Sequence, residues 1–306
     1  MNAINPFVQQ SVGWLEQLHG LLILYPALAW ALVLTIGLAS GSFLGCLIYR
    51  LPIILVAEWK EQARALLADD WRNHELQFKT PELSLWRPGS FCPSCRHPVG
   101  LPGLIPLLGY MLLRGRCRHC RAPIDISYPL LELAGVFVAV WCYANFGFSW
   151  MGLFLWYFSL AALALAWVDA KSTLLPDQLL TPLLVVGLIV NYFALFTPFA
   201  SSFWGCVGAY LLFALVASLA RLILRREALG WGDVKLLAAL AAWSGWETLP
   251  LLLFMATTSA LIFLFVRLLI SGISLRQPMP FGPFLLGSGW LIMQAQHLLG
   301  FNAVWL

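Results

Sequence analysis

The chain has 306 residues, of which 61% are hydrophobic and only 10% are charged. Because a soluble domain carries about a quarter charged residues, this composition excludes a soluble protein and favours one embedded in a membrane. The formal net charge of +4 is less informative than where the charges lie, and we expect membrane lipid, not nucleic acid, as a partner.

Hydropathy predicts an all-α polytopic membrane protein with about eight transmembrane helices. Most of the apolar segments have the length of about 20 residues that crosses a hydrocarbon core. The sixth, with 13 residues, is expected to be partly embedded or tilted. No cleavable signal peptide is predicted, because residues 1–26 contain no Lys or Arg. The predicted spans lie near residues 27–49, 128–146, 150–168, 178–196, 203–224, 234–246, 249–270 and 281–301.

Basic residues predict the orientation. The polar segment 50–125, between the first two spans, holds 11 of the 18 Lys and Arg residues. If the spans alternate, the remaining seven fall on the same side, and the opposite connections carry none. Because cytoplasmic loops are enriched in Lys and Arg, this side is predicted to be cytoplasmic and both chain ends to lie opposite. The seven are Lys171, Arg221, Arg225, Arg226, Lys235, Arg267 and Arg276.

Residues 55–70 follow the first span and have the pattern of a short amphipathic helix, with Lys60, Glu61 and Arg64 on the wet face. Such a helix can lie on the membrane surface. A solvated helix belonging to the polar segment is an equal alternative.

Two CxxC pairs follow, Cys92–Cys95 and Cys117–Cys120, separated by 21 residues. This spacing predicts a tetrahedral zinc site, which is structural because four sulfurs leave no open coordination position. Two disulfides are the alternative, and a reducing cytoplasm disfavours them. His97 and His119 lie beside the pairs and either could replace a sulfur, although surface positions are favoured. Cys46, Cys142 and Cys206 are interpreted as small apolar residues of the spans.

Carboxylates near membrane spans are candidates for function, because burying them in lipid is costly. Asp177 opens the fourth span, where it matches the start of a helix. Glu132 lies in the second span and can pair with a loop arginine. Asp169 and Asp233 are predicted to lie at the same membrane face, because two antiparallel spans separate them.

Two carboxylates at a partly dry surface can activate water when one is ionised and the other protonated. We expect Asp233 to be ionised, since it lies at the positive end of the sixth helix and beside Lys235. Asp169, at the negative end of the third helix, is expected to start protonated. Gly230 and Gly232 are expected to turn the backbone sharply and bring Asp233 close to a bound peptide.

Several motifs together resemble the type IV prepilin peptidases, which are membrane aspartyl proteases of the GxGD class. The resemblance implies a bifunctional enzyme of the bacterial inner membrane, with catalytic residues Asp169 and Asp233 facing the cytoplasm. It implies cleavage of the leader of type IV prepilins or type II secretion pseudopilins, then N-methylation of the new N-terminus from S-adenosylmethionine. The motifs are LLPD (174–177) after Asp169, GWGD (230–233), GSFLGCLIYRLP (41–52), the CxxC pairs, and PMPFGPFL (278–285).

Gly45 and Ser127 stand where this family commonly has Asn and Arg, in the part linked to methyl transfer. Candidates on the methyltransferase side are Glu132, as a partner for the substrate amine, and Arg50. The expected domains are an N-terminal transmembrane helix (1–50), a cytoplasmic zinc-binding domain (51–126) and a transmembrane peptidase domain (127–306). Alternatives are a related GxGD peptidase without methyl transfer, a zinc-regulated transporter, and a noncatalytic assembly protein of the secretion inner-membrane complex.

Overall fold

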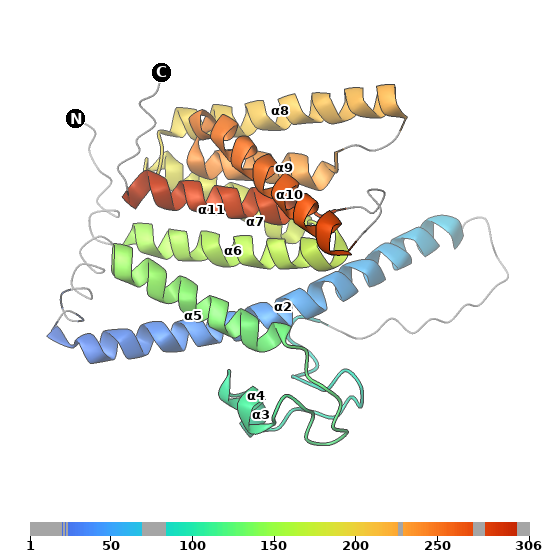
Figure 1. Ribbon diagram of the computed structural model, residues 1–306, viewed down its shortest axis with the longest axis vertical. Helices are drawn as coiled ribbons and strands as arrows, with labels where there is room; N and C mark the ends of the chain where they lie inside the picture. The colour runs from blue at the N-terminus through green and yellow to red at the C-terminus, as the bar shows by residue number, and fades with distance from the viewer. Residues whose placement is uncertain are drawn as a thin grey trace. The chain divides into compact units, whose positions relative to one another are not determined.

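The computed structural model describes residues 20, 22, 24–68, 84–225, 229–271 and 279–298. These residues form helices and loops, with two isolated β-bridges in the loops. The helices, labelled in Figure 1, are α2 (Pro26–Ala68), α3 (Leu101–Leu104), α4 (Leu108–Leu112), α5 (Ser127–Phe146), α6 (Trp150–Ser172), α7 (Asp177–Tyr192), α8 (Phe199–Leu224), α9 (Trp231–Ser244), the 3₁₀ helix η1 (Trp246–Thr248), α10 (Leu249–Ser271) and α11 (Gly282–Leu298).

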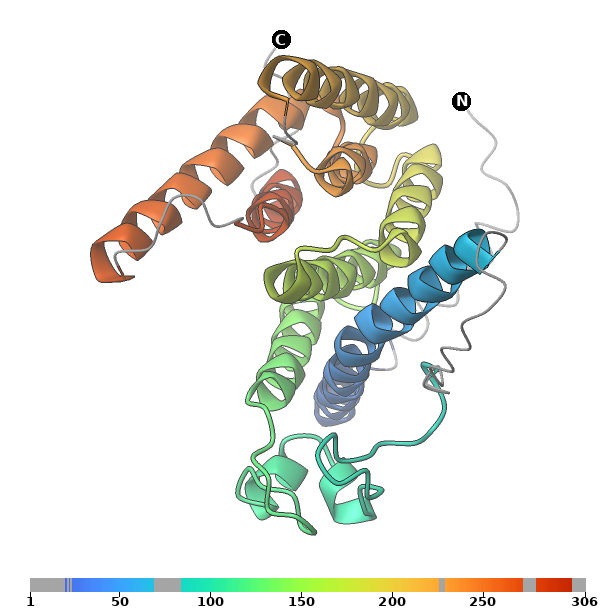
Figure 2. The same ribbon diagram turned by 90° about the vertical axis from the view of Figure 1, so that its right-hand side faces the viewer.

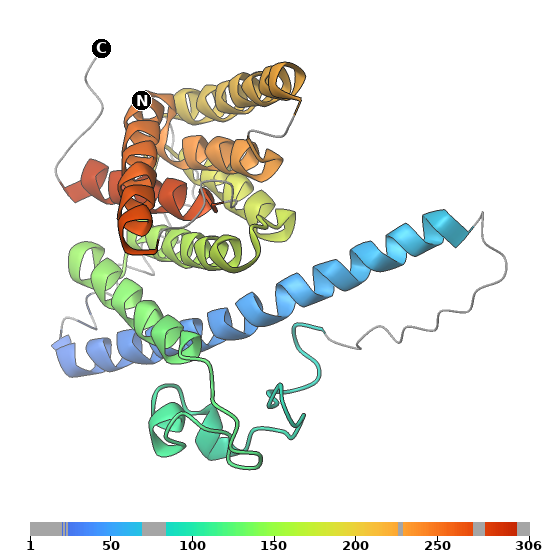
Figure 3. The ribbon, with the colours of Figure 1, turned by 45° about the vertical axis from the view of Figure 1, so that its right-hand side comes forward.

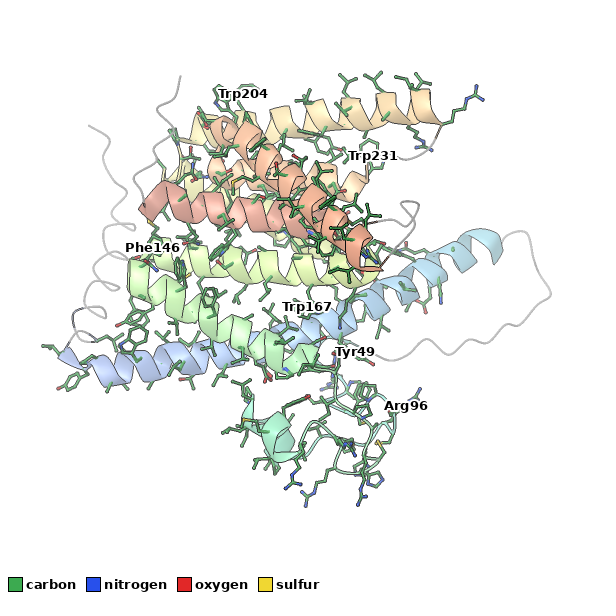
Figure 4. The ribbon with its side chains drawn as sticks, in the orientation of Figure 1. Tyr49, Arg96, Phe146, Trp167, Trp204 and Trp231 are labelled. Atoms are coloured by element: carbon green, nitrogen blue, oxygen red, sulfur yellow. The ribbon has the colours of Figure 1, made fainter. Side chains whose placement is uncertain are left out.

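Five stretches in the described residues are long and apolar enough to cross a membrane: Pro26–Ala63 in α2, all of α5 and α6, Phe199–Ile223 in α8, and Trp246–Ile270. The all-α polytopic membrane fold is thereby confirmed. The other predicted segments are also helical, as α7, α9 and α11, but these helices are shorter. The number of spans, about eight, stays a prediction. Trp204 of α8 and Trp231 of α9, labelled in Figure 4, are 66% and 45% exposed, as expected of lipid-facing or interfacial side chains.

The described chain divides into two compact units. Of the described residues, those from 22 to 141 form the N-terminal unit, and Gly20 and those from 142 to 298 form the C-terminal unit. Each unit is described by itself below. The predicted functional division at residues 50 and 126 stays a prediction.

In the N-terminal unit, α2 and α5 cross backbone to backbone through glycines. A Cβ added at Gly41 would lie 2.5 Å from the Glu132 Cα, and one at Gly37 would lie 2.7 Å from the Val136 Cα. Small residues allow this approach between membrane helices, where dispersion contacts replace a hydrophobic driving force. Gly45 continues the row and faces the ring of Tyr128, 3.1 Å from the position of a Cβ. In this structure the GSFLG stretch therefore serves helix packing.

Helix α2 is one continuous helix of 43 residues. The prediction of a separate helix over 55–70 is wrong, because α2 continues through Pro52 to Ala68. A proline removes only one intrahelical hydrogen bond and clashes with one carbonyl, and here the helix continues on both sides of it. The side chains of 64–68 and all of 69–83 lie outside the described residues, as do Arg226 and Arg276.

In the C-terminal unit, α9 is the central helix. It packs against α7, α8 and α11, and Figure 2 shows it nearly end-on among them. Residues Leu236–Ser244 are all buried. With 14 residues, α9 is only about 21 Å long, shorter than the hydrocarbon core of about 30 Å. It is therefore surrounded by protein along nearly its whole length.

The C-terminal end of α9 exposes carbonyl groups that lipid cannot satisfy, and buried side chains bind them. The side-chain amide of Asn191, which is fully buried, donates to the carbonyl oxygens of Ala242 at 2.8 Å and Trp243 at 3.0 Å. The Ser202 hydroxyl donates to Ala242 O at 2.6 Å. Because an unsatisfied backbone group in lipid costs several kcal/mol, these contacts allow a short helix to end inside the bundle.

Trp243 fixes α9 against α7. Its indole N–H donates to the Leu183 carbonyl at 2.8 Å, and its ring lies over Gly187, where a Cβ would approach the indole Cδ1 to 2.6 Å. The ring of Phe158 of α6 packs on it with centroids 5.0 Å apart. The position of α9, and of the aspartate at its start, is thus determined by close packing.

Candidate active site and metal centre

Asp169 lies in the last turn of α6 and is buried, with 4% of its surface exposed. The N–H of Gly282, the first residue of α11, donates to Asp169 Oδ2 at 3.0 Å. A Cβ at position 282 would lie 2.6 Å from the same oxygen, so only glycine allows this approach. The sequence contains the PMPFGPFL motif but does not show what the motif does. The structure shows that its glycine, Gly282, binds the Asp169 carboxylate. The first residue of the motif, Pro278, lies outside the described residues.

Asp233 lies in the first turn of α9 and is half-buried. Its Oδ2 atom lies 3.4 Å from the position that a Cβ at Gly230 would take, and α11, whose first residue binds Asp169, packs against both α6 and α9. The predicted pair of aspartates is thus brought to one end of the helix bundle, from residues 64 positions apart in the chain.

The glycines of GWGD have a role different from the one predicted. Gly230 has φ −70° and ψ 140°, an ordinary extended conformation, so the prediction of a sharp turn is wrong. Gly232 instead allows close packing: a Cβ there would lie 2.9 Å from the Leu175 Cβ. The GWGD segment is therefore pressed against the LLPD segment.

Lys235 binds Asp177 instead of supporting Asp233. Its Nζ lies 2.7 Å from Asp177 Oδ1 and 2.8 Å from Oδ2. The expectation that Lys235 favours ionised Asp233 is wrong because residues two apart on a helix point to different faces. Helix α7 begins at Asp177, so the predicted helix start is confirmed, and the ion pair joins this start to α9.

The helix dipoles beside the two aspartates differ less than the sequence suggested. Asp169 is at the negative end of α6, but its carboxylate accepts the first N–H of α11, which is the positive end of a helix dipole. Asp233 lies at the positive end of α9. Both carboxylates therefore have a helix N-terminus beside them, and the predicted assignment of the proton to Asp169 loses its electrostatic basis.

The four cysteines of the two CxxC pairs gather as predicted. Their Sγ atoms all lie within 4.8 Å of one another, and Cys92 Sγ lies 3.8 Å from Cys120 Sγ. Ligands at the Zn–S distance of 2.3 Å in a tetrahedron are separated by about 3.8 Å, so the cluster fits a metal ion of this size. All four are free thiols, and the alternative of two disulfides is wrong.

The two pairs are built alike, which favours a symmetric metal site. Each turn is closed by a backbone bond, from Arg96 N to Cys92 O at 2.8 Å and from Arg121 N to Cys117 O at 2.9 Å. Hydrogen bonds from the backbone of Cys95, and then of Ser94, lower the pKa of the Cys92 thiol to about 6 despite burial. This favours the thiolate form of Cys92, which a metal requires. At Cys120, a backbone hydrogen bond at Ala122 lowers the pKa, but burial and the neighbouring cysteine thiols outweigh it and raise the pKa to about 11.

His97 and His119 are exposed and stack on each other, with ring centroids 4.2 Å apart and planes 4° apart. They lie outside the four-residue cluster that can hold a metal. The favoured prediction, that they are surface residues of the loop, agrees with this position.

Arg50 and Glu132, the candidates on the methyltransferase side, bind backbone groups. The Arg50 guanidinium, 5% exposed, donates to the carbonyls of Ser84 at 2.9 Å and Gly89 at 3.0 Å. Glu132 accepts the N–H of Leu107 at 2.7 Å and a hydrogen bond from the Ser42 side chain. The prediction that Glu132 pairs with a loop arginine is wrong. Both side chains hold the loop onto the helices, and their part in methyl transfer stays a prediction.

A bundle of apolar helices with Asp169 and Asp233 at one end is typical of the class of polytopic membrane enzymes. The family described as "Bacterial Peptidase A24 N-terminal domain" matches residues 35–146, and the "Type IV leader peptidase family" matches residues 154–265. No solved structure matches the chain.

Relatives with the name "Prepilin leader peptidase/N-methyltransferase" include proteins from three different bacteria. The one from Stutzerimonas stutzeri is 38% identical over 85% of this chain and 88% of its own length. That from Aeromonas salmonicida (strain A449) is 36% identical over 91% and 94%, and that from Legionella pneumophila is 38% identical over 90% and 94%. The chain belongs to the type IV leader peptidase family of membrane aspartyl peptidases.

Proposed function

We propose that the protein removes the leader peptide from type IV prepilins or type II secretion pseudopilins at the cytoplasmic face of the bacterial inner membrane. The observation that carries the proposal is that Asp169 of α6 and Asp233 of α9 lie at one end of the bundle, since α11, whose first residue binds Asp169, packs against both helices. Relatives that cover most of the chain have prepilin leader peptidase in their names.

The chemistry follows from two carboxylates that hold one proton between them. The ionised member takes a proton from water, whose oxygen attacks the scissile carbonyl carbon. The protonated member hydrogen-bonds to the carbonyl oxygen and neutralises its developing charge. When the C–N bond breaks, the leaving amine takes the proton gained from water. The N–H of Gly282 orients Asp169 throughout, because it binds Oδ2.

The substrate is an apolar N-terminal helix that lies among the spans and leaves a short basic leader at the membrane face. The family resemblance implies a glycine just before the cut. A glycine suits this site because the backbone must be approached closely from two sides.

The N-terminal unit is proposed to contribute methyl transfer to the new N-terminal amine, with S-adenosylmethionine as the methyl donor. The name of the relatives includes this activity. Zinc is proposed as the metal of Cys92, Cys95, Cys117 and Cys120, where it closes the loop and takes no part in peptide cleavage.

The test is incubation of the purified protein with a candidate prepilin and S-adenosylmethionine carrying a labelled methyl group. Mass analysis should show loss of the leader and one labelled methyl group on the new N-terminus. Cleavage without the label would leave the alternative of a peptidase alone. No cleavage of any prepilin or pseudopilin by a protein with a full metal site would contradict the proposed function.

A further inference from the structure

The loop between the two cysteine pairs contains a stretch that does not suit a cytoplasmic segment. From Val99 to Leu113 there is no charged residue, although the surrounding segment 50–125 was predicted to be polar. This stretch forms α3 and α4, which lie against each other below α5 in Figure 3. An apolar run of about 10–14 residues is too short to span a bilayer and is typical of a buried helix or an interfacial or re-entrant segment.

The side chains of this stretch are not buried. Backbone contact holds the two short helices together, since a Cβ at Gly109 would lie 2.8 Å from the Gly103 carbonyl oxygen. The large side chains consequently point outward: Leu101 is 82% exposed, Met111 71% and Leu112 68%. Residues 101–113 are called the apolar hairpin below. Because these side chains are exposed, the hairpin is not a buried core helix. Of the alternatives above, an interfacial segment fits the exposure.

The tip of the apolar hairpin is attached to a membrane helix. Leu107 is the centre of a γ-turn, with φ 59° and ψ −52° and a bond from Leu108 N to Pro106 O at 2.6 Å. This form of the γ-turn is rare and strained, so it persists only where contacts hold it. Here the Leu107 N–H donates to Glu132 at 2.7 Å.

This contact places the tip of the hairpin beside the first turns of α5, which is apolar and long enough to cross a membrane. Glu132 is five residues from the first residue of α5, which is about 7–8 Å along the helix. Its backbone packs against Gly41 of α2, and both helices are long and apolar enough to span the membrane. The tip therefore lies beside two spanning helices and inside their ends.

The residues that flank the hairpin are basic. Asp125 is the single acidic residue between positions 84 and 126, and the segment contains six arginines. Arg96, labelled in Figure 4, lies in the loop of the first cysteine pair. Anionic lipid headgroups attract such a segment, whereas a basic prepilin leader is repelled by it. The arginines are Arg87, Arg96, Arg114, Arg116, Arg118 and Arg121.

We propose that the apolar hairpin inserts into the interface of an anionic lipid bilayer, with the arginines of the cysteine pairs at the headgroups and the Glu132–Leu107 contact setting its depth. The metal site then joins the two ends of a lipid-anchored loop, because Cys95 and Cys117 lie on either side of it. This holds the N-terminal unit's loop against the membrane surface whether or not the peptidase is active.

The test places a fluorescent amino acid at Met111 of the full-length protein, reconstituted in nanodiscs of anionic lipid with brominated acyl chains. The matched control carries the label at Ser94, which is exposed in the first cysteine pair. We expect loss of fluorescence at position 111 and none at 94, relative to discs with unbrominated lipid. Equal fluorescence at position 111 in both lipids, in protein with a full metal site, would overturn the proposal.

Other occupants of the surface give different results. If the hairpin binds the apolar helix of a substrate, fluorescence at position 111 changes only when a prepilin is added. If it binds a second copy of the chain, the signal depends on the number of copies per disc. Either result, without quenching by brominated lipid, contradicts insertion.

Two further comparisons test the depth and the charge. Glu132→Gln keeps an oxygen acceptor for the Leu107 N–H and should keep the quenching, whereas Glu132→Leu lacks it and should lose most of it while still folding, as judged by thermal unfolding. Replacing anionic by zwitterionic lipid should weaken the quenching. Equal quenching in both lipids would overturn the role of the arginines.

Discussion

The two units of the molecule use buried and half-buried charged side chains in opposite ways. In the N-terminal unit, Arg50 and Glu132 lie among apolar helices and their polar atoms bind backbone groups of the loop that contains the cysteines. In the C-terminal unit, Asp169 and Asp233 lie on two helices that pack against the same third helix, α11, and Asp169 accepts one backbone N–H. A charge that is bound by backbone groups stabilises architecture, whereas a pair of like charges brought together is available for proton transfer.

The largest effect is expected from removing either charge of the aspartate pair. Asp169→Asn and Asp233→Asn should each lower cleavage of a prepilin by roughly 1000-fold or more, because the members of a catalytic unit fail together. Cleavage is followed by mass spectrometry, with membrane insertion and metal content as controls. Robust cleavage by either variant would show that the two aspartates do not act together in proton transfer, and the contrast with Arg50 and Glu132 would be lost.

The second-largest loss of cleavage is expected for Gly282→Ala, because the new Cβ would lie 2.6 Å from Asp169 Oδ2. Displacing a catalytic group by about 1 Å can cost about 100-fold in rate, so we expect a loss of about that size in kcat. Gly287→Ala is the matched control on the same helix, since nothing lies within 4 Å of a Cβ there. Equal activity of the two variants would show that the Gly282 contact does not position Asp169.

Removing a cysteine of the metal site should affect the proposed activities of the two units differently. Cys92→Ser should release the metal and lower methyl transfer strongly, because a structural zinc contributes folding free energy directly, with a smaller effect on cleavage. Metal analysis of the purified protein and the two activities are measured together. Cys46→Ser, outside the cluster, is the control. Unchanged metal content in Cys92→Ser would contradict the four-sulfur site.

The smallest effect is expected at the ion pair between Lys235 and Asp177, whose side chains are 41% and 58% exposed. Exposed ion pairs contribute about 0.2–1 kcal/mol, so Asp177→Asn should retain cleavage within about fivefold of the unchanged protein. Loss of activity as large as in Asp169→Asn would mean that Asp177 is the partner of Asp233.

The predictions from local patterns were the most accurate. Helix α7 begins at Asp177, as the pattern of a helix start predicted, and the four cysteines meet as their spacing predicted. The apolar hairpin was missed because a window of about 20 residues averages its 13 apolar residues with the arginines around them. A search for shorter apolar runs would have found it.

The sequence by itself determined the class of protein, the helices and the residues with functional chemistry, because composition and periodicity are local properties. The tertiary structure decided which of these residues meet. It pairs Lys235 with Asp177, 58 positions away, and Gly282 with Asp169, 113 positions away. Such pairs depend on how closely whole helices approach each other. That distance is set by contacts such as the one between Gly187 and Trp243. The sequence shows the glycine on one helix but not the indole ring of the other helix that packs against it.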